Sequence, residues 1–558
     1  MSYIVLIVAK MLELSLFING EFVESASGNT YTVINPATEE VVCRVSEGGA
    51  EDIDAAVQAA RAAFRRDSVW RTMDASERGR LLYCLADALQ QHSEEFASLE
   101  ALDTGKPLES ARGDVDFAVS TLRYFAGYSD KFHGQVIPCN GDVVCYTRRE
   151  PVGVVGAIIP WNYPLDIIVQ KVAPALAMGC CLVVKPSEET PLSALLLSHL
   201  ISQIGRHQYM LETDLSQRLN GVKLVTRKRN QITGHLPCNH KDFLFLAGIP
   251  PGVVNVVPGY GETAGAALAN HPGVNAVTFT GSTAVGHSIM IAAATNFKRI
   301  NLELGGKSAL IIFADASDCK LLSLSTLAPT SILHHDHLSL DKAAEVAFEE
   351  VMGNAGQCCV AATRTFVEAP IYEEMVERFR KLAQKRVLGD PFQPGVQQGP
   401  QISKVQMETV LKYIASGVEE GARLVAGGRR MKGEAGFFIE PTVFADVHDG
   451  MRIAREEIFG PVQVVLRFTD VDEVIRRANA SHYGLGGGVF SGDADKALRV
   501  AQALEAGTVW INSYNTSPPM QPFGGYKHSG IGREMGKEGL RFYTEVKSIS
   551  MPISKKNS

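Results

Sequence analysis

The sequence has few cysteines, no block of basic residues and no long apolar run, and each absence excludes a class of protein. Ten cysteines among 558 residues are too sparse for a disulfide scaffold, and none forms the Cys-x-x-Cys pair of a zinc site or dithiol motif. We therefore expect no metal site. No run approaches the roughly 18 apolar residues of a membrane-spanning helix. With a net charge of −7 and no basic cluster, neither nucleic acid nor a membrane surface is an expected partner.

The N-terminus lacks the features of a targeting segment. Residues 3–9 are apolar, but no basic residue precedes them and Glu13 follows closely. The Arg- and Ser-rich character of a mitochondrial transit peptide is also missing, and Met11 could equally serve as a start. We expect a cytoplasmic protein, with the mitochondrion as the alternative.

The length and the pattern of apolar residues predict more than one α/β domain. A chain of 558 residues is too long for a single core. Short β-branched runs, each followed by Pro, Gly, Ser or Thr and a helical pattern, indicate a doubly wound parallel sheet. A second set of strands begins after Gly306. The predicted strands are residues 152–159, 181–185, 253–257 and 276–280, then 308–313, 364–368 and 462–468.

Two segments carry residues able to react with a substrate. Residues 354–360, Asn-Ala-Gly-Gln-Cys-Cys-Val, place adjacent cysteines after a Gly-Gln turn, and a thiolate is the strongest side-chain nucleophile near neutral pH. An inert, buried thiol is the alternative. Glu303 lies in an apolar strand before a glycine pair, where burial should raise its pKa and suit it as a base. A salt-bridged structural carboxylate is the alternative there.

Other segments suit a dinucleotide. Asn162 follows a predicted strand at the edge where open α/β sheets bind ligands, and its amide could donate to an oxyanion; a turn-forming Asn is the alternative. Lys185 and Glu188 follow a second strand and could face a ribose. Residues 279–283, Phe-Thr-Gly-Ser-Thr, join a strand to a helix whose N-terminus favours phosphate, whereas the glycine turn at 258–265 misses the usual fingerprint spacing by one residue.

Taken in this order, the segments resemble the aldehyde dehydrogenase superfamily, and the class 1/2 enzymes in particular. The resemblance runs from about Phe17 to the C-terminus and includes Glu-Glu-Ile-Phe-Gly-Pro at 456–461 and Pro-Phe-Gly-Gly-Tyr-Lys at 522–527. It implies NAD-dependent oxidation of an aldehyde to a carboxylic acid through a cysteine thiohemiacetal and thioester. It also implies that the chain assembles as a homodimer or a homotetramer.

The resemblance also implies roles for individual residues. Cys359 would be the nucleophile, Glu303 the base that activates water, and Asn162 an oxyanion donor together with the backbone N–H of Cys359. The positions that match cofactor-binding residues are Ile159, Pro160, Trp161, Lys185, Glu188, Gly261, Gly265, Phe279, Thr280, Gly281, Ser282, Gln406, Glu457 and Phe459.

The implied fold is α/β, with a Rossmann-like NAD-binding domain at residues 11–132 and 152–304 and an α/β catalytic domain at residues 305–528. A small β bridging element for oligomerisation would comprise residues 133–151 and 540–558. The substrate tunnel departs from class 2 relatives, which carry bulky aromatics where this chain has Gly353, Gln170 and Ser517, with Asp166 beside Tyr163. We expect a wider and more polar tunnel.

Two stretches fit neither the pattern nor the resemblance. Residues 205–245 add roughly 40 residues between a helix and a strand, and residues 319–340 lengthen the Glu303–Cys359 spacing by roughly 20. Translated introns or gene-model errors are our interpretation, with genuine surface loops as the alternative. A CoA-acylating semialdehyde dehydrogenase, or a silent NAD-binding protein if the insertions disrupt the site, are the competing functions.

Overall fold

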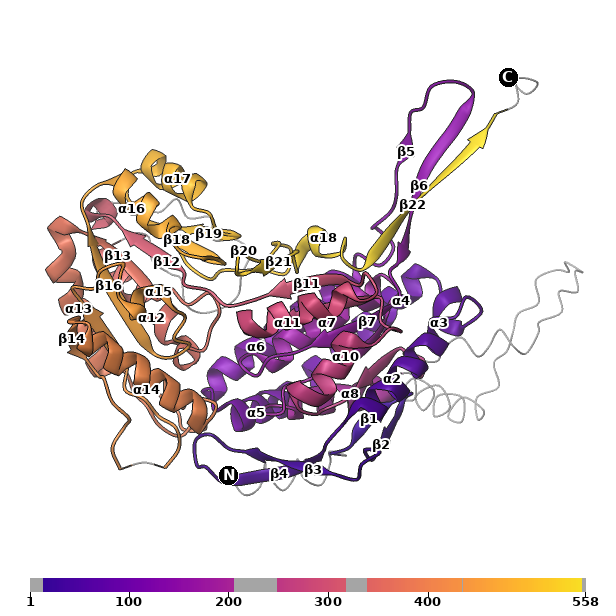
Figure 1. Cartoon of the computed structure of the whole chain (residues 1–558), viewed down its shortest axis with the longest axis horizontal. Helices are drawn as coiled ribbons and strands as arrows, with labels where there is room; N and C mark the ends of the chain where they lie inside the picture. The colour runs from indigo at the N-terminus through magenta and orange to yellow at the C-terminus, as the bar shows by residue number, and fades with distance from the viewer. Residues whose placement is uncertain (1–13, 205–247, 318–338, 434, 554–558) are drawn as a thin grey trace, which may run out of the picture.

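The computed structural model describes residues 14–204, 248–317, 339–433 and 435–553. These residues form two large sheets that lie side by side, with helices over their faces, and a narrow third sheet that projects from the body (Figure 1). The predicted insertion at 205–245 lies outside the described residues. So does most of 319–340, although Ser339 and Leu340 are described as the N-cap and the first residue of the next helix.

The first sheet has eight strands in the order β2-β1-β9-β8-β7-β10-β11-β21. Its five central strands are parallel, as predicted, and the edge strands β1, β2 and β21 are antiparallel. The strands are β1 (Leu16–Ile18), β2 (Glu21–Val23), β7 (Val154–Ile158), β8 (Cys181–Lys185), β9 (Val254–Val256), β10 (Ala276–Thr280), β11 (Arg299–Glu303) and β21 (Gly530–Ile531).

The chain reverses its direction of travel across this sheet between β7 and β10. From β7 it moves outward through β8 to β9, then returns to β10 on the other side of β7 and continues to β11. Such a switch point leaves a crevice at the carboxyl ends of the strands, which is where open α/β sheets bind ligands. Residues that follow β7 and β10 therefore face a common crevice.

Helices cover both faces of the first sheet. Residues 50–91 form three of them, with breaks at residues 64–68 and 73–74. The helices of this half are α2 (Ala50–Ala63), α3 (Val69–Thr72), α4 (Ala75–Gln91), α5 (Ser93–Thr104), α6 (Leu108–Ala126), α7 (Pro164–Ala177), α8 (Leu192–Gln203), α10 (Ala266–Asn270) and α11 (Thr283–Ala294). No helix within the described ranges is long and apolar enough to cross a membrane.

The second sheet has seven strands in the order β14-β15-β16-β13-β12-β18-β19. Alternate residues of β12 contribute to two different apolar clusters, because Leu310 and Ile312 face one side and Ala309 and Ile311 the other. Burial on both faces explains why these strands read as continuous apolar runs. The strands are β12 (Ala309–Ile312), β13 (Arg364–Glu368), β14 (Arg423–Ala426), β15 (Thr442–Ala445), β16 (Val462–Phe468), β18 (Gly486–Phe490) and β19 (Thr508–Ile511).

The helices of the second half flank this sheet in the same manner. They are α12 (Leu340–Met352), α13 (Tyr372–Lys385), α14 (Lys404–Glu419), α15 (Arg452–Arg455), α16 (Val471–Asn479) and α17 (Ala494–Ala503). Among the strands of the two large sheets, those before residue 304 belong to the first sheet and those after it belong to the second. The exception is β21, which comes late in the chain but joins the first sheet. Its residues lie outside every predicted domain range.

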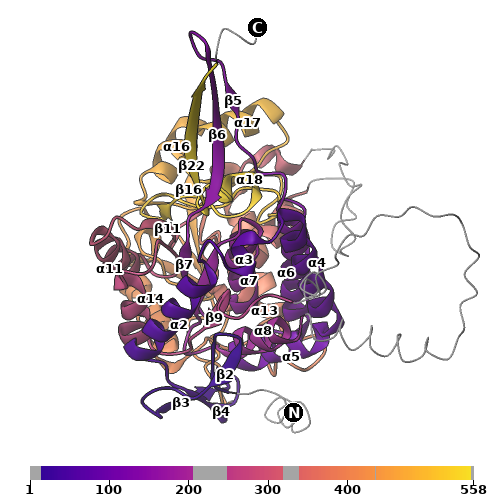
Figure 2. The ribbon, with the colours of Figure 1, turned by 90° about the vertical axis from the view of Figure 1, so that its right-hand side faces the viewer.

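The third sheet joins two distant parts of the chain. Its strands are β5 (Val136–Ile137), β6 (Val143–Pro151) and β22 (Thr544–Pro552), and β22 pairs antiparallel with β6 along its whole length. Figure 2 shows from the side that the free end of this sheet extends beyond both lobes. The remaining short elements are β3 (Thr30–Ile34), β4 (Val41–Ser46), β17 (Tyr483–Gly484), β20 (Tyr526–Lys527) and α18 (Gly536–Gly539).

Candidate functional site

Two cavities meet at the junction between the large sheets. One has a volume of about 330 Å³ and the other about 310 Å³. Three residues line both cavities: Asn162, Glu303 and Cys359. The three residues singled out as catalytic from the sequence therefore lie on the wall between two binding spaces, although 197 positions separate the first from the last.

The loop that carries Cys359 is set by an unusual backbone. Helix α12 begins at the cap Ser339, whose side chain accepts from the Lys342 N–H, and ends at Gly353. Asn354 and Ala355 then adopt φ values of 47° and 54°, in the left-handed region that disfavours a residue with a Cβ. Strain of this kind persists where the surrounding structure holds it, often at functional sites.

Two glycines permit the close packing around this loop. A Cβ on Gly356 would lie 2.0 Å from the carbonyl of Gly460, and a Cβ on Gly306 would lie 2.3 Å from the Cys359 carbonyl oxygen. Neither approach is open to any other residue type without movement of the backbone. Gly306, in the glycine pair after Glu303, must therefore lack a side chain because the cysteine loop packs directly against it.

Glu303 is the last residue of β11 and its side chain is buried. Burial, followed by the nearby Glu534 carboxylate, raises the pKa of Glu303 to about 8. Its Oε1 atom has no hydrogen-bond partner among the described residues. The Cys358 thiol, burial and the Glu303 carboxylate together raise the pKa of Cys359 well above its usual range. Below a pH of about 8, a protonated thiol therefore faces a carboxyl group that can accept a proton only after it ionises.

Asn162 is directed at the cysteine loop. Its Nδ2 donates to the backbone carbonyl of Gln357 at 3.1 Å, and its backbone carbonyl accepts from the Asn354 side chain at 2.9 Å. A side-chain amide has two N–H groups, so one N–H of Asn162 remains for a ligand in the cavity. The placement fits an oxyanion donor.

A buried ion pair that the sequence analysis missed lies behind Glu303. Lys171, on α7, pairs with Glu534 and also donates to the Thr280 hydroxyl at 2.9 Å. Glu534 accepts in addition from Asn301 at 2.9 Å. Lys171 and Glu534 are separated by 363 positions, so no local pattern could have joined them.

The 310 Å³ cavity lies at the switch point of the first sheet. The turn from β10 into α11 lines it with Thr280, Gly281 and Ser282, and the Ser282 side chain caps α11 by accepting from Val285. The positive end of a helix dipole therefore faces the cavity. The other predicted cofactor residues on its wall are Pro160, Trp161, Gln406, Glu457 and Phe459.

The second lobe closes this cavity. Glu457 accepts from the Gly306 N–H at 2.9 Å, and Gln406 donates to the Phe459 carbonyl at 2.8 Å. The rings of Trp161 and Phe459 meet edge to face at 5.3 Å. A polar floor under an aromatic rim, adjoining Cys359, fits the nicotinamide half of a dinucleotide.

The remaining predicted cofactor residues lie outside the lining of this cavity. Lys185 pairs with Glu188 at 2.8 Å, and a Cβ on Gly265 would come within 4.0 Å of the Lys185 side chain. Gly261 is exposed, whereas Ile159 and Phe279 are buried. Residues 261–265 form a wide helical turn leading into α10, where we expected a simple glycine turn. Lys185, Glu188 and Gly265 thus form a separate group farther along the crevice.

The 330 Å³ cavity is the predicted substrate tunnel. Tyr163, Asp166, Gln170 and Ser517 line it as expected. Gly353 terminates α12 and is not among the lining residues, and no atom lies within 4 Å of a Cβ built on it.

Several residues that line the two cavities were not predicted from the sequence. Thr409 and Tyr413 line the cofactor cavity together with Gln406, and spacings of three and four residues put all three on one face of α14. That periodicity could have found them. In the tunnel, the missed residues are Asp114, Phe117, Ile167, Asn515, Gln521, Phe523 and Met535.

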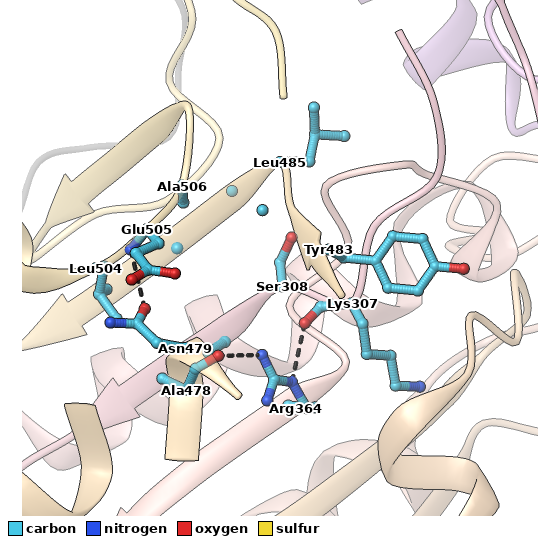
Figure 3. A pocket seen from close by; sticks show the side chains of 14 residues that line it. Lys307, Ser308, Arg364, Ala478, Asn479, Tyr483, Leu485, Leu504, Glu505 and Ala506 are labelled. Carbon is cyan, nitrogen blue, oxygen red and sulfur yellow. Dashed lines mark hydrogen bonds between the residues drawn. The ribbon is translucent and has the colours of Figure 1, made fainter. Parts of the chain in front are cut away.

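A third, small cavity lies beside the start of β12 (Figure 3). Arg364 crosses its floor and donates to the carbonyls of Lys307 and Ala478 at 2.9 and 2.8 Å. Burial lowers the pKa of Lys307 to about 7, and its Nζ has no partner among the described residues. A volume of about 20 Å³ holds a single water and excludes a substrate. Across the described part of the chain, no group of three His, Cys, Asp or Glu could hold a metal ion.

Comparison with known proteins gives one consistent result. The Aldehyde dehydrogenase family matches residues 22–213, 241–328 and 321–549. An aldehyde dehydrogenase of Enchytraeus buchholzi is 49% identical over 536 residues, covering 96% of this chain and 95% of that protein. Retinal dehydrogenase 2 of Mus musculus is 49% identical over 545 residues, covering 97% and 92%.

Comparison with solved structures gives the same family. The NAD⁺ complex of an aldehyde dehydrogenase from Bacillus cereus superposes with a TM-score of 0.85 at 44% identity, covering 98% of each chain. The predicted α/β fold class is thereby confirmed. The family match is interrupted between residues 213 and 241, inside the first anomalous stretch, and divides again near residues 321–328, inside the second.

Proposed function

Because this chain belongs to the aldehyde dehydrogenase family and oxidises aldehydes to carboxylic acids with NAD, we propose that Cys359 is its nucleophile and Glu303 its general base. The observation that carries the assignment is the shared wall, where both residues and Asn162 border the two cavities. A substrate carbonyl entering from one side would meet the thiol opposite the cofactor cavity.

The first step is attack of the Cys359 sulfur on the aldehyde carbon. The thiol proton passes to Glu303, whose raised pKa suits it to accept and release a proton near neutral pH. Negative charge then develops on the former carbonyl oxygen. The free N–H of Asn162 and the backbone N–H of Cys359 would stabilise it, an effect worth about 3–4 kcal/mol for a single donor in other enzymes.

The residues on the 310 Å³ cavity would hold NAD, which accepts a hydride from the thiohemiacetal carbon and leaves a thioester on Cys359. Gly305 and Glu457 fit this group closely, since a Cβ on Gly305 would lie 2.2 Å from the Glu457 carboxylate and occupy the floor. Farther along, Lys185 and Glu188 would face the adenosine ribose, and a carboxylate there favours NAD over its 2′-phosphorylated form.

Hydrolysis of the thioester completes the reaction. Glu303 would first release the thiol proton to solvent and then take a proton from water. The resulting hydroxide would add to the thioester carbon, and the carbon–sulfur bond would break to release the acid. The sulfur leaves as a thiolate and regains its proton from Glu303. Because this chain carries the carboxylate that activates water, no acyl acceptor such as CoA is required.

Rapid-mixing kinetics test these assignments. We expect a burst of NADH with wild type and no burst with Cys359→Ala. With Glu303→Gln we expect a slower burst that is not followed by steady turnover, because both the thiol and the hydrolytic water then lack their proton acceptor. A burst that survives in Cys359→Ala would refute the nucleophile. Release of free acid without CoA separates this reaction from acyl transfer to CoA.

We also propose that the chain forms a homodimer or homotetramer through the third sheet. That sheet exposes apolar side chains at Val136, Ile137, Tyr146, Val546 and Met551, and it has open strand edges at β5 and β22. Exposed apolar patches and free edges on a monomer indicate an interface. Light scattering of wild type and Val546→Glu tests this, since the variant should dissociate; an unchanged assembly would point to another surface.

We propose a cytoplasmic location because the described cysteines are reduced. The eight cysteines within the described ranges are free thiols, as expected in a reducing compartment. Cell fractionation distinguishes the cytoplasm from the mitochondrion.

A further inference from the structure

Asp166 occupies the substrate tunnel without a partner. It lies in the first turn of α7, three residues after Tyr163, and lines the same cavity as Cys359. Its Oδ1 atom is out of reach of solvent and has no hydrogen-bond partner in the described part of the chain. The residue as a whole is only partly buried on the cavity wall, where a carboxylate is costly unless a ligand compensates its charge.

The charges around Asp166 do not neutralise it. From α6, Asp114 lines the same cavity and is already paired with Lys106, which precedes α6 and also faces the Glu100 carboxylate of α5 at 3.7 Å. Lys106 is further engaged with the Tyr163 ring at 4.2 Å. No Lys, Arg or His is among the described residues that line this cavity. One lysine therefore pairs with the carboxyl groups of Asp114 and Glu100, and Asp166 has no ion pair of its own among the described residues.

We propose that the tunnel selects aldehydes bearing a protonated primary amino group, with Asp166 as the residue that receives the ammonium. The inference rests on the proposed reaction at Cys359 and adds the class of substrate. An ammonium supplies both the positive charge and the N–H donors that Asp166 lacks. The rings of Tyr163, Phe117 and Phe523 on the same wall would favour a cation over a neutral group of equal size.

The charge state of Asp166 gives this selection a pH dependence. Burial and the Asp114 and Glu100 carboxylates raise the pKa of Asp166 well above its usual range, and Lys106 only partly opposes them. A bound ammonium favours the carboxylate, so binding releases a proton. The KM for an amino aldehyde should therefore fall as pH rises, whereas the KM for an uncharged aldehyde should not show this fall.

Matched aldehydes test the proposal. We compare 3-aminopropanal with butanal, and 6-aminohexanal with heptanal, because in each pair a methyl group replaces the ammonium; 3-hydroxypropanal supplies a neutral donor. In wild type, kcat/KM for an amino aldehyde should exceed that of its alkanal by about tenfold or more, as expected for a charge-assisted hydrogen bond. In Asp166→Asn this ratio should fall towards one.

Asp116→Asn is the control, because Asp116 lies two residues from Asp114 on α6 but is exposed. It removes the same charge outside the tunnel and should keep the wild-type ratio. A wild-type ratio near one, or equal preference for 3-hydroxypropanal, overturns the proposal. If no aldehyde is oxidised, the reaction assigned to Cys359 fails instead. Calorimetric titration with propylammonium then still tests Asp166, since wild type should bind it and Asp166→Asn should not.

Discussion

The contact between Gly306 and the cysteine loop leads to a quantitative prediction for Gly306→Ala. The φ angle at Gly306 is not positive, so alanine is permitted by the backbone and only its Cβ is at issue. That Cβ would lie 2.3 Å from the Cys359 carbonyl oxygen, whereas ordinary contacts begin at 3.4 Å. The loop must therefore retreat by about 1 Å, a misplacement that can cost about a hundredfold in rate.

The assay is steady-state kcat with a saturating aldehyde, together with NADH binding and the thermal midpoint. We expect kcat to fall by about a hundredfold. NADH binding should persist, and the overpacking should lower stability by about 1–3 kcal/mol. Gly113→Ala is the matched control, because Gly113 lies on α6 with no atom within 4 Å of a new Cβ. A kcat of Gly306→Ala within twofold of wild type would show that the contact does not position the nucleophile.

Three further predictions follow from the site and the sequence. Since Glu303 accepts protons only when ionised, kcat should rise with pH through about 8, and a pH–rate profile without that limb would contradict the assignment. Lys106→Met leaves two buried carboxylates uncompensated and should cost about 3–5 kcal/mol in urea unfolding; a smaller loss would mean that they are neutral. Mature transcripts should lack the segments that encode residues 205–245 and 319–340, and abundant messages containing them would make both stretches genuine loops.

The strands were predictable because of how they are buried. Residues 181–185, 276–280, 364–368 and 462–468 form strands with the predicted bounds. Each lies inside a parallel sheet covered on both faces, and such strands appear as short apolar runs ended by turn-forming residues. The run at 152–159 was predicted too long by three residues, because its ends leave the sheet while remaining apolar.

The buried charges could not be predicted in the same way. In the sequence, Lys106, Asp114 and Asp166 look like the polar positions of amphipathic helices, which normally face solvent. They meet only because α5, α6 and α7 pack together, which brings Asp114 and Asp166 to the tunnel wall and Lys106 into its ion pair with Asp114. A single sequence shows which residues carry charge but not which distant charges share a cavity. For that reason the nucleophile and the base came from local motifs, whereas the residues that we propose for specificity came from the structure.

The short crossing between the two large sheets explains how Glu303 and Cys359 come to share one wall. Glu303 ends β11 and β12 begins at Ala309, so five residues connect the sheets. Ser529 holds this crossing from the side, accepting from Leu304 at 2.9 Å and donating to Gly305 at 2.7 Å. The cysteine loop packs directly on the crossing at Gly306. The distance between base and nucleophile is therefore set by this contact rather than by the length of chain between them. It follows that the stretch inserted before α12 lengthens the sequence separation while both residues still line the same cavities.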